Sequence, residues 1–142
     1  MFAKQLTVFL ENRTGRLSEA LGVLKDNNVN ILSLSLADTT EFGLLRLIVD
    51  NAPYGKEKLS EAGFSSLLTD VLIIEIPHSA GSLQKLLDLI DDEGVNIEYM
   101  YGLSVQSTEA HVVLKASDGA KVAEILTAQG VNTLSCEDLQ KM

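Results

Sequence analysis

The sequence predicts an α+β fold built from two consecutive units of the same design, and the main observation behind this prediction is an internal repeat. Residues 12–31 (NRTGRLSEALGVLKDNNVNI) align with residues 78–97 (HSAGSLQKLLDLIDDEGVNI) at a constant offset of 66 and without a gap. Seven of the 17 positions from Gly15 to Ile31 are identical to their counterparts in the second copy. A repeat of this length indicates two units of one architecture.

The second observation is that both units, residues 1–69 and 70–142, show the same order of apolar patterns: strand, helix, strand, strand, helix, strand. In the first unit we expect strands at 4–10, 29–36, 43–50 and 64–68, and helices across residues 17–24 and 57–62. In the second unit we expect strands at 71–76, 95–103, 109–116 and 131–136, and helices at 82–93 and 118–129. This order is typical of ferredoxin-like units, which have an antiparallel sheet with both helices on one face.

Apolar stripes at helical spacing justify the first helix of each unit. The stripes consist of Leu17, Ala20, Leu21 and Leu24 in the first unit, and of Leu83, Leu86, Leu87 and Ile90 in the second. The second helix of the first unit is expected near Pro53, which suits a first helical turn, and should end at Gly63. Polar turns are expected at 11–15, 38–42 and 77–81.

Only Thr69 and Asp70 separate the last expected strand of the first unit from the first expected strand of the second. A flexible linker would be longer and richer in Gly, Ser or Pro. We therefore expect the two antiparallel sheets to be joined side by side, as one eight-stranded sheet with the helices on one face. Such joining also removes two exposed strand edges.

Composition excludes several classes of function. The chain carries 11 Lys and Arg against 20 Asp and Glu, a formal net charge of −9, which argues against nucleic acid and against anionic membranes as partners. The single cysteine, Cys136, excludes a disulfide within the chain and fits a reducing compartment. We see no signal peptide and no apolar run near the ~20 residues of a membrane-spanning helix, so we expect a cytoplasmic location.

The polar turn before the first helix is the strongest candidate site. Gly15 leaves room for close approach of a ligand to the backbone, and the N–H groups that follow it are the unpaired donors of a helix start. Such a site prefers an anion, and a small carboxylate fits. The structural alternative is that Asn12 and Thr14 only cap the helix.

These residues resemble a known family. The pattern N-x-x-G-x-L, an amphipathic helix and then V-N-I at the start of the next strand is similar to the ACT domain, and the resemblance covers nearly the whole chain twice. It implies a small-molecule regulatory module that senses free amino acids. It also implies that paired units hold the ligand between the first loop of one unit and the second strand of the other.

Carried over to this chain, the resemblance implies two related ligand sites. The first joins Asn12, Thr14, Gly15, Arg16 and Leu17 to Asn96, Ile97, Glu98 and Tyr99. The second joins His78, Ser79, Gly81, Ser82 and Leu83 to Asn30, Ile31 and Leu32. Because the loop asparagine of the first copy is a histidine in the second, we expect unequal affinities, with the first site the stronger.

The resemblance also implies roles for these groups. Loop N–H groups would bind the ligand carboxylate, and Asn12 or Asn96 its ammonium. Glu11 and Glu98 lie close in sequence to the first site and slightly favour a cationic or imidazole ligand side chain, although each is also explained as a solvated surface charge. Asn30 and Asn96 have their own alternative, a turn or left-handed backbone before the strand.

Three functions remain in competition: an amino-acid sensor, an interaction module that binds no ligand, and a small enzyme. We do not expect an enzyme, because Cys136 has no neighbouring Cys-His pattern and no spacing typical of a metal site or phosphate loop occurs. His111 alternates within a predicted strand and is interpreted as structural. No cofactor is expected. The partner would be an enzyme, a transporter or a second copy in a homodimer.

Overall fold

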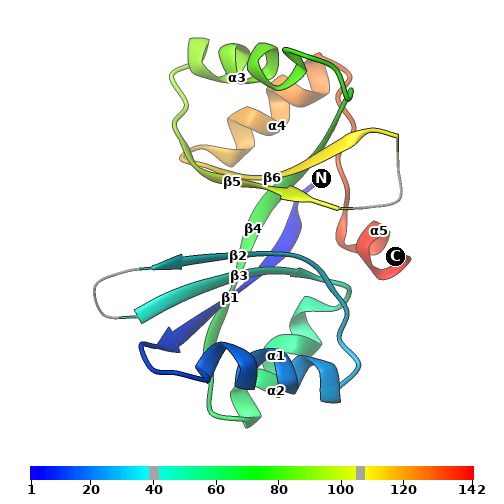
Figure 1. Ribbon diagram of the computed structural model, residues 1–142. Helices are drawn as coiled ribbons and strands as arrows, with labels where there is room; N and C mark the ends of the chain where they lie inside the picture. The colour runs from blue at the N-terminus through cyan, green and yellow to red at the C-terminus, as the bar shows by residue number, and fades with distance from the viewer. Residues whose placement is uncertain (39–41, 105–107) are drawn as a thin grey trace. The chain divides into compact units, whose positions relative to one another are not determined.

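The computed structural model describes residues 1–38, 42–104 and 108–142 (Figure 1). Its contacts divide the chain into two compact units. The N-terminal unit comprises Lys4–Thr69 together with the last residues, Leu139–Met142. The C-terminal unit comprises Asp70–Asp138 together with the first residues, Met1–Ala3.

The N-terminal unit contains most of strand β1 (Ala3–Glu11), helix α1 (Arg16–Asp26), β2 (Ile31–Asp38), β3 (Phe42–Val49), α2 (Ala52–Glu61) and the beginning of β4 (Ser65–Ile76). Its strands are ordered β2-β3-β1-β4, with β3 antiparallel to both β1 and β2. Alternate residues of β1 and β3 and one face of each helix form its core. The largest of these side chains, all fully buried, are Leu6, Leu24, Leu45, Leu47 and Leu59.

The C-terminal unit contains the remainder of β4, α3 (Ser82–Asp92), β5 (Ile97–Leu103), β6 (Ala110–Ala116), α4 (Gly119–Ala128) and the start of α5 (Cys136–Gln140). Its strands are ordered β4-β6-β5, and β6 is antiparallel to both neighbours. Its core repeats the arrangement of the first unit. Leu72, Ile74, Ile90, Leu114 and Leu126 are its largest fully buried members.

These elements confirm the α+β class and the strand-helix-strand-strand-helix-strand order of the first unit, which the second unit repeats as far as its last strand. The strand count is corrected from eight to six among the described residues. The expected strands 64–68 and 71–76 form one continuous strand, β4, which runs through Thr69 and Asp70. No Gly, Pro or Asn interrupts this stretch, and threonine and valine favour extended backbone, so nothing ends the strand there.

The expected strand 131–136 is also wrong. Residues 132–134 keep a bridge and two backbone hydrogen bonds to β4, Glu75 N–H to Asn132 O and Leu134 N–H to Ile73 O at 2.9 Å each, but they form no regular strand, and a helix starts at Cys136. The cause is a reciprocal cap: Asp138 N–H donates to Ser135 Oγ at 3.3 Å, and Ser135 N–H donates to Asp138 Oδ2 at 2.8 Å. This pattern, serine followed three residues later by an acid, starts a helix.

Helix α2 begins earlier than the expected residue 57. Asn51 is its N-cap, and Asn51 Oδ1 accepts the N–H of Tyr54 at 3.3 Å, while Pro53 occupies the first turn. A capping side chain and a proline in the first turn together start a helix at this point. The expected turn 38–42 contains residues 39–41, which lie outside the described residues.

Candidate functional site

The loop before α1 and the loop before α3 have the same backbone geometry. Gly15 and Gly81 occupy the N-cap positions with φ of 92° and 84°, in the left-handed region. Matching hydrogen bonds close the two loops: Arg13 N–H donates to Glu11 O at 2.8 Å, and Ser79 N–H donates to Pro77 O at 2.9 Å. The repeat therefore preserves one backbone shape that only glycine adopts easily at this position.

No side-chain hydrogen bond caps α1 or α3 in the described part of the chain. Asn12 and Thr14, which the sequence also allowed as caps, therefore do not have that role. The helix starts rest instead on backbone bonds such as Glu19 N–H to Gly15 O at 3.0 Å and Lys85 N–H to Gly81 O at 3.0 Å. The first N–H groups of each helix stay without a capping side chain, and the positive end of the helix dipole lies behind them.

The V-N-I segments are also duplicated. Asn30 N–H donates to Asp50 Oδ1 at 3.1 Å, and Asn96 N–H donates to Ser117 Oγ at 3.0 Å. The carbonyl groups of both asparagines accept a bond from the backbone of the same partner residue. The left-handed residues of these segments are Asn28 and Gly94, so Asn30 and Asn96 do not serve that purpose. Their exposed side chains stay available to a ligand.

Four charged side chains surround the first loop. Arg16 Nη1 lies 2.8 Å from Glu19 Oε2, and Arg16 Nη2 lies 3.7 Å from Glu11 Oε1. Arg13 contacts the same two acids at 3.4 and 3.6 Å. The hydrogen bond from Arg16 and the charges of both arginines lower the pKa of the Glu19 carboxyl below its usual 4.5, although partial burial acts the other way.

Arg16 is the most enclosed of these groups. Its side chain is 11% exposed, and its guanidinium carbon lies 4.0 Å from the centroid of the Phe64 ring. Its Nε is buried and has no hydrogen-bond partner among the described residues. Arg16 lines two cavities beside the first loop, of about 200 and 380 Å³.

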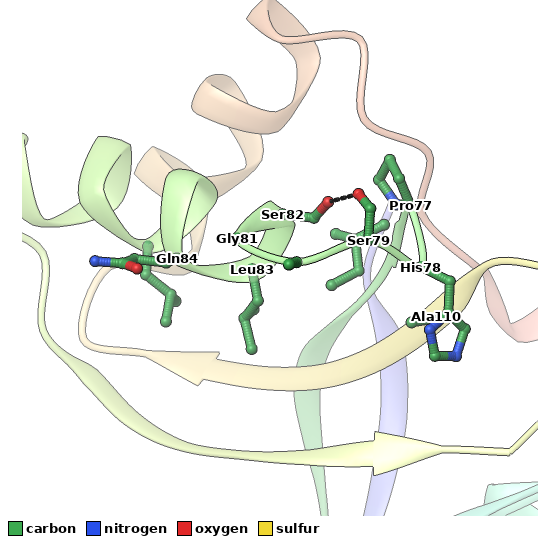
Figure 2. A pocket seen from close by; sticks show the side chains of 11 residues that line it. Pro77, His78, Ser79, Gly81, Ser82, Leu83, Gln84 and Ala110 are labelled. Carbon is green, nitrogen blue, oxygen red and sulfur yellow. Dashed lines mark hydrogen bonds between the residues drawn. The ribbon is translucent and has the colours of Figure 1, made fainter.

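The second loop carries no arginine and opens onto a larger cavity of about 580 Å³ (Figure 2). Its hydroxyl groups form one hydrogen bond, Ser79 Oγ to Ser82 Oγ at 2.7 Å. The lining of the cavity comes entirely from the C-terminal unit: Ile76, Pro77, His78, Ser79, Ala80, Gly81, Ser82, Leu83, Gln84, Leu87 and Ala110.

All five predicted loop residues of the second site line this cavity. Of the predicted first-loop residues, Asn12, Arg16 and Leu17 line the cavity of about 200 Å³, whereas Thr14 and Gly15 are exposed beside it. The strand residues assigned to each site, Asn96–Tyr99 and Asn30–Leu32, belong to the other unit, so the composite sites stay a prediction.

Sequence reasoning missed several lining residues. Gln84 and Leu87 lie on the exposed and partly buried sides of α3, and Ala110 begins β6. In the N-terminal unit, Leu36 and Gly43 line the cavity of about 200 Å³ and were also missed. The available signal was the helical periodicity that places residue 87 one turn after residue 83.

Both acids that favoured a cationic ligand already have partners. Glu98 Oε1 lies 3.2 Å from Lys115 Nζ, and Glu11 contacts Arg13 and Arg16. These ion pairs reduce the negative charge available to a ligand side chain, so the structure does not strengthen the inference that the ligand is basic.

The remaining candidates have structural environments. His111 is 5% exposed, and its Nε2 lies 3.3 Å from Glu75 Oε2 on the neighbouring strand, in agreement with the structural interpretation. Within the described residues, no group of three or more His, Cys, Asp or Glu side chains is placed to hold a metal ion. None of the helices described has the length and apolar character required to cross a membrane.

Comparisons with known proteins agree with this geometry. A family model described as an ACT domain pair matches residues 1–142. The chain is 39% identical to protein BT0572 from Bacteroides thetaiotaomicron, with a TM-score of 0.92 over 100% of this chain and 98% of that one. It resembles in fold the regulatory subunit of aspartate kinase from Thermus thermophilus, with 14% identity, a TM-score of 0.60, and coverage of 88% and 91%. No curated protein matches the chain.

A duplicated ferredoxin-like unit with glycine-capped loops defines a regulatory module of the ACT class. The chain belongs to the ACT domain pair family. The expected resemblance to this family is therefore confirmed over the whole chain.

Proposed function

We propose that this protein is a stand-alone sensor that binds a free amino acid at the loop before an ACT helix and regulates a partner. The observation that carries the proposal is the second loop, where an uncapped helix start opens onto a cavity of about 580 Å³. The fold shared with the regulatory subunit of aspartate kinase supports a regulatory role.

The proposed binding mode follows from the groups present. The N–H groups at the start of α3 would bind the carboxylate, because they are donors at the positive end of a helix. The hydroxyl groups of Ser79 and Ser82 are acceptors suited to the ammonium. The apolar part of the ligand would contact Leu83 and Leu87 in the cavity.

The loop around Asn12, which the sequence pairs with Asn96, is the related candidate in the N-terminal unit. Sequence reasoning placed the stronger site here, but the cavity geometry supports the opposite order. Two separate cavities of about 200 and 380 Å³ lie beside Asn12, against one cavity of about 580 Å³ beside His78. We therefore propose the loop of the C-terminal unit as the principal site.

The alternative function, an interaction module without a ligand, is favoured by one observation. Strand β2 has a single strand neighbour in the described sheet, and its Leu34 and Leu36 are 49% and 53% exposed. An edge strand with exposed leucines is suited to pairing with another chain. A second copy, a partner enzyme and a transporter are the candidate partners under either function.

Thermal unfolding in the presence of each of the twenty amino acids tests the sensor. A ligand at 100 times its dissociation constant adds about 2.7 kcal/mol to the free energy of unfolding. We expect at least one amino acid at millimolar concentration to raise the melting temperature. If none does, the sensor function is wrong and the interaction module is favoured.

A matched pair of variants tests the location. Gly81 and Gly94 both have positive φ, of 84° and 73°, and a Cβ at either meets no atom within 4 Å. Alanine is strained in this region by about 1–2 kcal/mol at either position. We expect Gly81→Ala to abolish the amino-acid shift and Gly94→Ala to keep it. Equal shifts in both variants would place the site elsewhere.

A further inference from the structure

We propose that Arg16 is an internal plug that closes the first loop to ligands, so that each chain binds its amino acid at the second loop alone. This inference rests on the proposed function, since it states which of the two loops is open. It goes beyond that function because it assigns a residue and a mechanism to the difference between them.

Arg16 is held tightly by three neighbouring side chains. The guanidinium is 4.0 Å from the Phe64 ring centroid, 2.8 Å from Glu19 and 3.7 Å from Glu11. Stacking on an aromatic face and pairing with two carboxylates are the interactions that a planar guanidinium forms best. Its side chain is therefore only 11% exposed, whereas that of Arg13 in the same loop is 54% exposed.

The four side chains that form this assembly, called the clamp here, occur together only in the N-terminal unit. At the offset of 66, the clamp residues Arg16, Glu11 and Glu19 correspond to Ser82, Pro77 and Lys85. The fourth clamp residue, Phe64, follows the left-handed Gly63 and corresponds to Val131, which follows the left-handed Gly130. Among these residues of the C-terminal unit, only Lys85 is charged, and it is exposed. None of them is aromatic. The two loops thus share a backbone and differ in this one side-chain assembly.

The cavities beside the two loops differ in size, although matching residues line them. Six lining residues of the cavity of about 200 Å³ correspond, at the same offset, to lining residues of the cavity of about 580 Å³. Arg16 occupies the first helical position, where the smaller Ser82 stands in the other loop. Beside the first loop the open space is divided into cavities of about 200 and 380 Å³, both lined by Arg16, so the long side chain at the helix start interrupts a space that is continuous beside Ser82.

The opposite role for Arg16 would be that of an anchor, which binds the ligand carboxylate through its guanidinium. The acidic partners of Arg16 disfavour this role. An incoming carboxylate would compete with Glu11 and Glu19 for the same guanidinium and would be repelled by both acids. The Nε donor is buried without a partner among the described residues and is not presented to solvent. The two roles predict opposite effects of removing Arg16, because loss of a plug strengthens binding at the first loop whereas loss of an anchor weakens it.

The test follows the backbone amide signals of Gly15 and Gly81 in the full-length ¹⁵N-labelled protein. The probes are sodium acetate, as a minimal carboxylate, and each of the twenty amino acids. Arg16→Ser removes the plug. Arg13→Ser is the matched control, because it removes the same charge from the same loop at an exposed position.

In the unmodified protein and in Arg13→Ser we expect saturable shifts of Gly81 and none of Gly15. In Arg16→Ser we expect Gly15 to respond as well, with its apparent acetate affinity raised about tenfold or more. Saturable binding at Gly15 in the unmodified protein, or no gain in Arg16→Ser, overturns the plug. A loss of binding on removing Arg16 identifies it as an anchor and also overturns the plug.

The failure of the two proposals can be distinguished. If no amino acid shifts either glycine in any variant, the sensor function is wrong, while the acetate response of Gly15 still decides the plug. If Arg16→Ser does not fold, Glu19→Ala replaces it, since it removes the carboxylate that Arg16 contacts at 2.8 Å from an exposed residue. An intermediate acetate response at Gly15 is expected there, and its absence overturns the plug.

Discussion

The guanidinium of Arg16 stacks on the ring of Phe64, with 4.0 Å between the guanidinium carbon and the ring centroid. This contact joins the first turn of α1 to the residue just before β4. It orders a charged side chain that would otherwise extend into solvent from the loop.

Phe64→Leu should therefore destabilise the protein and loosen Arg16. Phe64 is 5% exposed, so its replacement loses packing as well as the cation–π contact, and we expect a loss of about 1–3 kcal/mol in the free energy of unfolding. Urea denaturation measures the loss. The same substitution in an Arg16→Met background isolates the cation–π part, which should be about 0.5–2 kcal/mol; an unchanged cost would show that the ring acts by packing alone.

The lowered pKa of Glu19 predicts a pH dependence of stability. Because its folded pKa is below the usual 4.5, Glu19 stabilises the folded state above that value, and this contribution is lost as the pH falls through the folded pKa. We expect Glu19→Gln to flatten the fall in stability below about pH 4.5, as measured by chemical denaturation across the acid range. Glu124→Gln, which removes a 75% exposed carboxylate, is the control and should leave the profile unchanged.

Two helical glycines should respond oppositely to alanine. A Cβ at Gly22 meets no atom within 4 Å, so Gly22→Ala should stabilise α1 by about 0.5–1 kcal/mol. A Cβ at Gly55 meets Leu6 at 3.3 Å and Leu24 at 3.4 Å, so crowding should cancel or reverse the gain in α2. Thermal unfolding of the two variants compares them directly. An equal gain at both sites would mean that the core around Gly55 gives way easily.

The exposed leucines of β2 predict self-association through that edge. Leu34→Lys should lower any concentration-dependent association measured by sedimentation velocity, because a lysine on an edge strand opposes pairing. Leu67→Lys is a suitable control, since Leu67 is also 40% exposed but lies on β4. If both variants associate like the unmodified protein, β2 is not the interface.

Local patterns in the sequence were sufficient to predict the repeated architecture and both loops. Gly15 and Gly81 mark positions that require left-handed backbone, and this requirement can be read without a structure. The start of α5 was also readable, because Ser135 and Asp138 form a capping box, but the apolar residues before it favoured a strand.

The plug could not be predicted in this way. Phe64 and Arg16 are far apart in sequence, and only the packing of α1 beside β4 brings them into contact. The loop sequence alone presents Arg16 as one more charged surface residue. Its burial depends on the Phe64 ring, which no local pattern places beside it. For this reason the sequence favoured the first site, whereas the cavities favour the second.

Strand β4 also determines how this protein can be divided. A cut between Thr69 and Asp70 severs a continuous strand, so neither fragment keeps its own β4 whole. Each fragment would also lose a terminal segment, because Leu139–Met142 belongs with the N-terminal unit and Met1–Ala3 with the C-terminal unit. We therefore expect that neither half of the duplicated sequence will be obtained intact when it is expressed alone.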